Sequence, residues 1–157
     1  MIKDPKKYVN LLLKYRLRSE AEIRDRMKRK GFSDRDIEEA IEYLQRIGLL
    51  NEELLAEEIY EKYTEKGLAL RKIKALLKRM GIKTDIVESF EKSEEVSQEV
   101  ISKIIERISG GEKELDQKKF RKIVSKLSYL GYNYWEIKNY LEKLGYKLKF
   151  TGFIDQE

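Results

Sequence analysis

The chain has 157 residues, which suffices for one ordinary domain or for several small modules. It contains neither cysteine nor histidine, which excludes disulfides, thiolate nucleophiles, imidazole bases and nearly all zinc sites. Charged residues make up 40% of the chain and proline occurs once, as is typical of a mostly helical protein with a solvated surface. The net charge of +5 permits contact with nucleic acid without requiring it. No apolar run approaches about 18 residues and the N-terminus lacks a signal-peptide core, so we expect a cytoplasmic protein without membrane contact.

One pattern recurs about every 50 residues, and glycines stand at positions 31, 81 and 131 within it. Its three copies are IRDRMKRKGF (Ile23–Phe32), IKALLKRMGI (Ile73–Ile82) and IVSKLSYLGY (Ile123–Tyr132). A glycine in the left-handed conformation commonly ends a helix, and the residue after it packs against the residue four before it. The pattern therefore predicts three helix ends, with the pairs Met27 and Phe32, Leu77 and Ile82, and Leu127 and Tyr132, rather than a ligand-binding glycine loop.

Helical periodicity predicts an all-α fold, an elongated array of three tandem three-helix repeats with a period of about 50 residues. Repeat 1 (residues 1–50) should hold helices near Lys6–Arg16, Ser19–Lys30 and Asp34–Ile47. Repeat 2 (51–92) should hold Glu52–Lys66, Ala69–Met80 and a helix starting near Asp85, which either ends near Lys92 or continues into the next helix. Repeat 3 (93–157) should hold Glu95–Ile108, Asp116–Leu130 and Tyr134–Leu144, followed by a tail that could form a brief extended piece.

The helix starts and turns have local signals. Ser33 has the character of an N-cap with Asp36 at the third helical position, and Asn133 matches it with Glu136. In repeat 2 we predict Thr84 as the cap. Gly110 and Gly111 indicate a turn between the first two helices of repeat 3.

The middle helix of each repeat carries excess basic charge, and Ala69–Met80 stands out with five basic residues and no acidic one. One interpretation is that these cations neutralise acidic neighbours, which contributes little to stability. The other is that they bind an acidic polymer or an acidic protein surface. The candidate contact residues are Arg24, Lys28, Lys30, Arg71, Lys74, Lys78, Arg79, Lys118, Lys122 and Lys126.

Aromatic residues gather near the C-terminus: Tyr129, Tyr132, Tyr134, Trp135, Tyr140, Tyr146 and Phe150. Aromatic side chains interleaved with lysine can stack on unpaired bases, but most of these residues, notably Tyr132 and Tyr140, have the spacing of core positions. Tyr134 and Trp135 are the least explained by packing, and we take them as candidate aromatic contacts.

Nothing in the sequence indicates catalysis. Adjacent acidic residues such as Glu52–Glu53 point about 100° apart on a helix and do not converge on one ion. We therefore predict no catalytic residue, no metal site and no cofactor.

Several local sequences between Arg18 and Ile82 match a known pattern. They are Ser-x-x-Glu-Ile (Ser19, Glu22, Ile23), Lys-Gly-Phe (Lys30–Phe32) and Gly-Leu-Leu-Asn-Glu (Gly48–Glu52), followed by Leu55-Ala56, Gly67 and a Met-Gly-Ile corner. This segment resembles the RecX regulatory family, and repeat 3 fits as a more divergent copy.

The resemblance implies a cytoplasmic bacterial regulator of tandem three-helix repeats that inhibits the ATPase and strand exchange of the RecA recombinase. It implies a role in DNA recombination and repair and in the SOS response. Its partners would be the RecA filament, bound in the helical groove or at the end, and single- or double-stranded DNA. We expect a monomer and no catalytic residues. Two alternatives stay open: a stand-alone DNA-binding module of helix-turn-helix-like units, and a passive helical scaffold.

Overall fold

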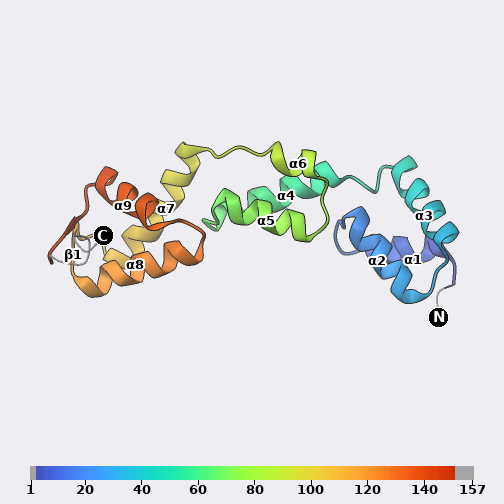
Figure 1. The fold of residues 1–157 in the computed structure, drawn as a ribbon, viewed down its shortest axis with the longest axis horizontal. Coiled ribbons are helices and arrows are strands. Elements are labelled where there is room, and N and C mark those ends of the chain that lie inside the picture. Colours follow the sequence, from blue (N-terminus) through green and yellow to red (C-terminus); the bar gives the residue numbers. More distant parts are fainter. Residues whose placement is uncertain (1–2, 151–157) are drawn as a thin grey trace. The chain divides into compact units, whose positions relative to one another are not determined.

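The computed structural model describes residues 3–150, which fold into helices joined by short turns (Figure 1). The fold is all-α with successive groups of three helices, as the sequence predicted. The first group comprises α1 (Pro5–Leu13), α2 (Glu20–Lys30) and α3 (Asp34–Arg46). The second comprises α4 (Glu52–Glu65), α5 (Leu70–Arg79) and α6 (Thr84–Glu88). The third comprises α7 (Glu94–Ser109), α8 (Gln117–Tyr129) and α9 (Tyr134–Lys143), with the short strands β1 (Glu114–Leu115) and β2 (Lys147–Leu148).

Side-chain caps fix most helix starts where the sequence placed them. The Ser33 and Asn133 side chains accept hydrogen bonds from the third residue of their helices, and Asn133 with Glu136 forms a complete capping box. The cap predicted in repeat 2 was wrong: Lys83 precedes α6 without a side-chain cap, and Thr84 is the first helical residue. The structure also decides between the two interpretations of the following segment, because α6 ends at Glu88 and α7 begins separately behind its cap, Ser93.

The three glycine corners have the predicted geometry. Gly31, Gly81 and Gly131 have φ angles of +96°, +79° and +106°, in the region that favours glycine. The next residue in each corner donates its N–H to the carbonyl of the residue four before the glycine, at 3.1 Å, 3.1 Å and 3.0 Å respectively. These bonds satisfy carbonyls that the end of a helix leaves without partners. The repeated glycines therefore end helices.

Contacts between residues divide the described chain into two compact units. Unit 1 holds residues 3–62 and 73–90, and unit 2 holds residues 63–72 and 91–150. The division passes through α4 and α5, each of which contributes residues to both units. The repeat boundaries 1–50, 51–92 and 93–157 therefore remain a prediction from sequence periodicity.

Unit 1 has a core formed by α1, α2 and α3. Ile23 and Met27 of α2, Leu44 of α3 and Val9 of α1 are fully buried in it. Tyr8 and Phe32 meet at its edge, with ring centroids 5.3 Å apart. Phe32 is the residue that follows the first glycine corner, so the corner positions a core side chain.

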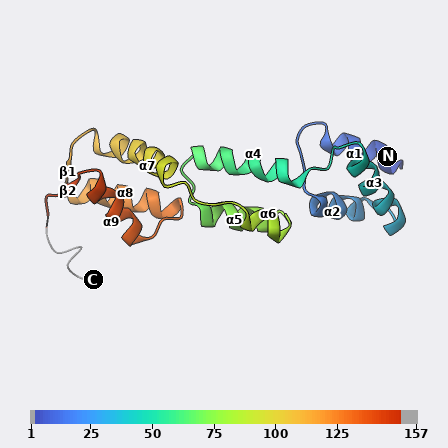
Figure 2. The same cartoon turned by 90° about the horizontal axis from the view of Figure 1, so that it is seen from above.

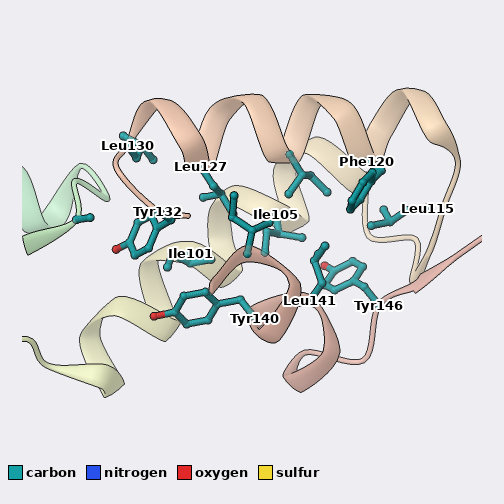
Figure 3. Packing of buried hydrophobic residues seen from close by; sticks show 13 residues of the cluster. Ile101, Ile105, Leu115, Phe120, Leu127, Leu130, Tyr132, Tyr140, Leu141 and Tyr146 are labelled. Carbon is teal, nitrogen blue, oxygen red and sulfur yellow. The ribbon is translucent and has the colours of Figure 1, made fainter. Parts of the chain in front are cut away.

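Unit 2 has a larger core between α7, α8 and α9 (Figure 3). Ile101 and Ile105 of α7 face Ile123 and Leu127 of α8, and all four are fully buried. Tyr132 and Tyr140 lie in this cluster with their rings edge to face, which confirms that they are core residues.

A small sheet closes unit 2 beside α8 and α9 (Figure 2). β1 and β2 pair in parallel, with Glu114 opposite Lys147 and Leu115 opposite Leu148. β2 agrees with the extended piece expected near the C-terminus, whereas no local sequence pattern indicates β1. Residues 151–157 lie outside the described residues. Phe150 follows β2 and packs against Phe120 with ring centroids 5.6 Å apart.

Two places in the fold have contacts of the same kind. In each, the start of the middle helix of one repeat contacts the glycine corner that ends the middle helix of the following repeat. In joint 1, inside unit 1, the Ser19 hydroxyl donates to the Met80 carbonyl at 2.6 Å, and Gly81 lies against Ala21. In joint 2, inside unit 2, the Ala69 N–H donates to the Leu130 carbonyl at 2.8 Å, and Gly131 lies against Ala69 and Lys72. The donor, the acceptor and the glycine of joint 2 each lie 50 positions after the corresponding residue of joint 1.

Two family-motif residues have structural roles in joint 1. Ser19 is fully buried, and its hydroxyl also caps α2 by accepting the Glu22 N–H at 3.1 Å. The Glu52 carboxylate accepts the Glu20 N–H at 2.9 Å and the Lys83 N–H at 3.4 Å, so it bridges the start of α2 and the start of α6. Both motifs are therefore explained by the joint.

Candidate partner-binding surface

The basic side chains of α2 are only partly available to a partner. Arg24 is half-buried and pairs with Glu20 of its own helix at 3.1 Å and with Glu38 of α3 at 2.6 Å. The hydrogen bond from Arg24 holds the pKa of the Glu38 carboxyl below its usual value. Lys28 and Lys30 are exposed and form no ion pair in the described part of the chain. At about 100° per residue they point to nearly opposite sides of the helix, so α2 does not present the three predicted cations as one row.

The cations of α5 face acidic residues from other helices. Arg71 pairs with Glu136 of α9 at 2.6 Å. Lys74 and Lys78 share Glu88 of α6, at 3.4 Å and 3.3 Å. These two lysines, Lys78 more than Lys74, hold the pKa of the Glu88 carboxyl below its usual value. Arg71, Lys74 and Lys78 are therefore paired although α5 itself contains no acidic residue.

Glu136 combines a structural role with the pairing of Arg71. Its carboxylate accepts the backbone N–H of Asn133 at 3.0 Å as the second half of the capping box. Partial burial acts to raise the pKa of Glu136, but the Asn133 N–H and the Arg71 guanidinium together bring it below its usual value. Arg71 also donates to the Gly131 carbonyl in joint 2. Arg71 is thus part of the fold of unit 2, while Arg79, at the end of α5, is exposed and forms no ion pair among the residues described.

The stripe on α8 has a different environment. Phe120, Ile123 and Leu127 bury one face of this helix, so side chains on its other faces are open to solvent. Four exposed cations of α8 form no ion pair within residues 3–150; we call them the α8 stripe: Lys118, Arg121, Lys122 and Lys126. Lys118, Lys122 and Lys126 follow one another at four-residue spacing, which places them along one side of the helix.

Lys119 shows what separates the α8 stripe from its neighbours. Its ammonium binds the Ser109 carbonyl at 3.0 Å and lies 3.3 Å from the Glu112 carboxylate, so its charge is used inside unit 2. The cations of the stripe have no such partner among residues 3–150 and remain available to an external anion.

Exposed aromatic residues lie at two places in unit 2. Tyr134 packs against the core of this unit, so packing explains it better than the sequence suggested. Trp135 is 58% exposed, and the Lys138 ammonium lies 5.2 Å from its ring centroid. Tyr129, at the end of α8, is 71% exposed and is therefore a better candidate contact than Tyr134.

Sequence reasoning missed Arg121 and Tyr129 as candidate contacts. Arg121 lies three residues after Lys118, and Tyr129 lies three residues after Lys126, so helical spacing carried a signal for both. Tyr129 was grouped with neighbouring tyrosines that are buried, which concealed it.

Across residues 3–150, no group of three acidic side chains is arranged to hold a metal ion. No helix within the same range combines the length and the apolar character needed to cross a lipid bilayer. The arrangement of the α8 stripe is suited to binding an anionic surface.

Comparison with known proteins identifies the family. Residues 11–44 match the family model for the first three-helix domain of RecX. The regulatory protein RecX of Thermotoga maritima is 30% identical over 145 residues, which cover 92% of this chain and 78% of that protein. The chain belongs to the RecX family. Its proteins carry the name of regulatory proteins rather than of enzymes.

Other RecX proteins share different lengths of the chain. The RecX protein of Clostridium perfringens strain SM101 is 33% identical over 126 residues, and the chain spans only 57% of its length. The crystal structure of RecX from Lactobacillus salivarius superposes with a TM-score of 0.73 at 22% identity, covering 89% of this chain and 94% of that one. This similarity confirms the fold. The resemblance that the sequence shows from Arg18 to Ile82 is confirmed at the level of the family by the Thermotoga maritima relative and by the family model.

Proposed function

We propose that this RecX-family chain is a negative regulator of the RecA recombinase, binding the RecA–DNA filament and inhibiting its ATPase and strand exchange. It would act in the bacterial cytoplasm as a monomer. Family membership supports the regulatory role, and the α8 stripe supports binding to an acidic surface.

The observation that carries this proposal is the difference between the cations of α5 and those of α8. A partner that engaged Arg71, Lys74 or Lys78 would have to compete with Glu136 and Glu88. A partner that engaged the α8 stripe would displace only water and counterions, because these side chains form no ion pair within the described residues. We therefore place the main contact with RecA or with DNA phosphates at α8.

Inhibition follows from binding one state of the filament more tightly than another. A ligand shifts an equilibrium only by the ratio of its affinities for the two states. If the chain binds the filament groove or its end in a form that hydrolyses ATP slowly, that form accumulates. Contacts from more than one repeat on successive protomers would raise the effective concentration of each further contact.

The experiment is a titration of the protein into RecA assembled on single-stranded DNA, with the rate of ATP hydrolysis as the readout. The test variant is Lys118→Glu with Lys122→Glu. The matched control is Lys143→Glu with Lys147→Glu, which changes the charge of the same unit by the same amount at two other exposed lysines. We expect the test variant to need at least about tenfold more protein for half-inhibition, and the control less than about twofold more. Half-inhibition by the test variant at the same concentration as the unaltered chain, with both variants folded as judged by circular dichroism, would contradict the assignment to α8.

The alternative, a stand-alone DNA-binding module, uses the same stripe and predicts a different salt dependence. If all four cations of the α8 stripe contact phosphates of bare duplex DNA, the slope of log K against log salt should be about −3.6. Tight binding to bare DNA with such a slope, and no tighter binding to the RecA–DNA filament, would favour the alternative.

A further inference from the structure

A surface groove in unit 2 lies beside the α8 stripe. It has a volume of about 850 Å³ and is formed by the end of α4 and the turn after it, by one face of α7 and by the end of α8. Pockets of this size accommodate a few side chains rather than a whole domain. The α7 side chains that line it run from Val96 to Arg107, at three- and four-residue spacing. That face is about 16 Å long at the helical rise of about 1.5 Å per residue, which equals three turns of a facing helix.

The floor of the groove is aliphatic. It is formed by side chains from three elements: Leu68, Val96, Val100, Ile104 and Leu130. Val96 is 40% exposed, an unusual exposure for an apolar residue in a hollow. Gly67 shapes one end, because its φ of +89° turns the chain after α4, and a Cβ there would lie 2.9 Å from the Ile104 Cδ1. The floor therefore offers a row of aliphatic side chains to a partner, and Gly67 lies directly against one of them, Ile104.

The rim of the groove is mainly basic. Lys66, Arg107 and Lys126 line it without an ion pair in the part of the chain that the structure describes. Lys103 also lines it and lies 3.4 Å from Glu99, but both side chains are about two-thirds exposed, where such a pair contributes little. Glu65 and Glu99 are the acidic residues of the lining. The rim thus carries unbalanced positive charge around an aliphatic floor.

We propose that this groove binds an acidic amphipathic helix of a partner protein, about three turns long. Apolar side chains at i, i+3 or i+4 and i+7 of that helix would contact the aliphatic floor, and acidic residues beside them would pair with the basic rim. This is the geometry by which an amphipathic helix binds in a groove. Tyr63 and Tyr129 also line the groove, and each ring is a surface on which a base could stack. The five aliphatic side chains of the floor outnumber these two rings, so an amphipathic helix fits the lining better than a nucleic acid does. The proposal goes beyond regulation of RecA and does not depend on it.

The test uses a designed probe, a fluorescein-labelled 14-residue peptide with blocked ends. Leucine occupies its i, i+3, i+4, i+7 and i+8 positions and glutamate most of the others. Two further peptides serve as controls: one has lysine in place of every glutamate, and the other has the same composition with the leucine spacing scrambled. Binding of each to the full chain is measured by fluorescence anisotropy at about 150 mM salt, where long-range attraction is screened. We expect the first peptide to bind at least about tenfold more tightly than either control.

Variants of the protein locate the binding site. Lys66→Glu with Arg107→Glu should weaken binding of the first peptide at least about tenfold. Lys118→Glu with Lys122→Glu, the same change in charge on the α8 stripe outside the groove, should weaken it less than about threefold. Val96→Asn should weaken it about threefold or more, because it removes an aliphatic contact that is already solvent-exposed and so leaves the fold intact.

Three results would overturn the proposal. The first is equal binding of the scrambled peptide, which would mean attraction by charge alone. The second is equal weakening by the groove and stripe variants, which would place the peptide elsewhere. The third is a single-stranded oligothymidine that displaces the peptide and itself loses binding in Lys66→Glu with Arg107→Glu, which would make the groove a nucleic-acid site.

Discussion

Gly81 provides a quantitative test of joint 1, with Gly31 as its matched control. Both glycines end a middle helix with positive φ, so alanine at either position should cost about 1–2 kcal/mol of folding free energy for the left-handed backbone. At Gly31 an added Cβ meets nothing within 4 Å. At Gly81 it would lie 2.4 Å from the Ala21 Cβ, well inside the usual separation of about 3.5–4 Å.

The clash at Gly81 adds to the backbone cost. Overpacking of this kind typically costs about 1–3 kcal/mol, because the corner must move away from α2 and strain the hydrogen bond between Ser19 and Met80. We therefore expect a loss of about 2–5 kcal/mol for Gly81→Ala and about 1–2 kcal/mol for Gly31→Ala. Native-state amide hydrogen exchange in α2 measures both, since these amides report the opening of unit 1.

A double-mutant cycle isolates the contact. Ala21→Gly removes the other half of the clash and should itself cost up to about 1 kcal/mol in the helix. In the background of Gly81→Ala it should restore stability, giving a coupling of about 1–3 kcal/mol. Equal losses for the two glycine variants, together with a coupling near zero, would refute the reasoning that the corner packs against the start of α2.

Three further predictions follow from particular contacts. Ser19→Ala removes a helix cap and leaves the partly buried Met80 carbonyl without its donor, so it should cost about 2–3 kcal/mol of folding free energy, against about 1 kcal/mol for the exposed cap variant Ser33→Ala, both measured by urea denaturation. Leu127→Ala in the core of unit 2 should lower the free energy of unfolding by about 2–5 kcal/mol. Unfolding can be monitored by the fluorescence of Trp135, the single tryptophan, which lies in the same unit. The pKa of Glu88 is lower in the folded chain than its unfolded value of 4.5. Its ion pairs therefore stabilise the fold fully at pH values above 4.5, and this contribution is lost as the pH falls through the lower pKa of the folded state. Carbon-13 NMR titration of the Glu88 carboxyl should show its pKa rising toward 4.5 in Lys78→Met, and an unchanged pKa there would contradict the pairing.

The glycine corners and the helix caps could be predicted because their causes are local. Gly31, Gly81 and Gly131 end helices through bonds within a span of six residues, and Asn133 caps α9 through Glu136 three residues away. The sequence contains every partner needed for these features. The same holds for the core periodicity of α8, whose buried face leaves the α8 stripe exposed.

Pairing of the α5 cations with acidic neighbours is one of the two interpretations that the sequence allows, but the partners themselves could not be predicted, because they come from other elements. Glu136 lies 65 residues after Arg71, and Glu88 lies 14 residues after Lys74. Counting charges within one helix gives α5 a large positive surplus, whereas the folded chain brings acidic side chains against it. The exposed row on α8 was predicted, but only the folded structure shows that it has no such partners within the described residues.

Joint 1, joint 2 and β1 also depend on tertiary contacts. Ser19 has the sequence character of an ordinary helix cap, and its second bond, to Met80, joins residues 61 positions apart. β1 has two residues and pairs in parallel with a strand more than 30 residues away, a pairing for which no local pattern exists. Glycine is thus needed at positions 81 and 131 for two reasons, the left-handed turn and the close approach of a neighbouring helix. Only the turn can be predicted from the sequence.

We propose that this RecX-family chain binds the RecA–DNA filament rather than DNA alone. The most direct measurement compares its affinity for single-stranded DNA, for RecA without DNA, and for the assembled filament, by fluorescence anisotropy of a labelled chain at one salt concentration. We predict binding to the filament at least about tenfold tighter than to either component, and loss of that preference in Lys118→Glu with Lys122→Glu. Equal affinity for bare DNA and for the filament would contradict it.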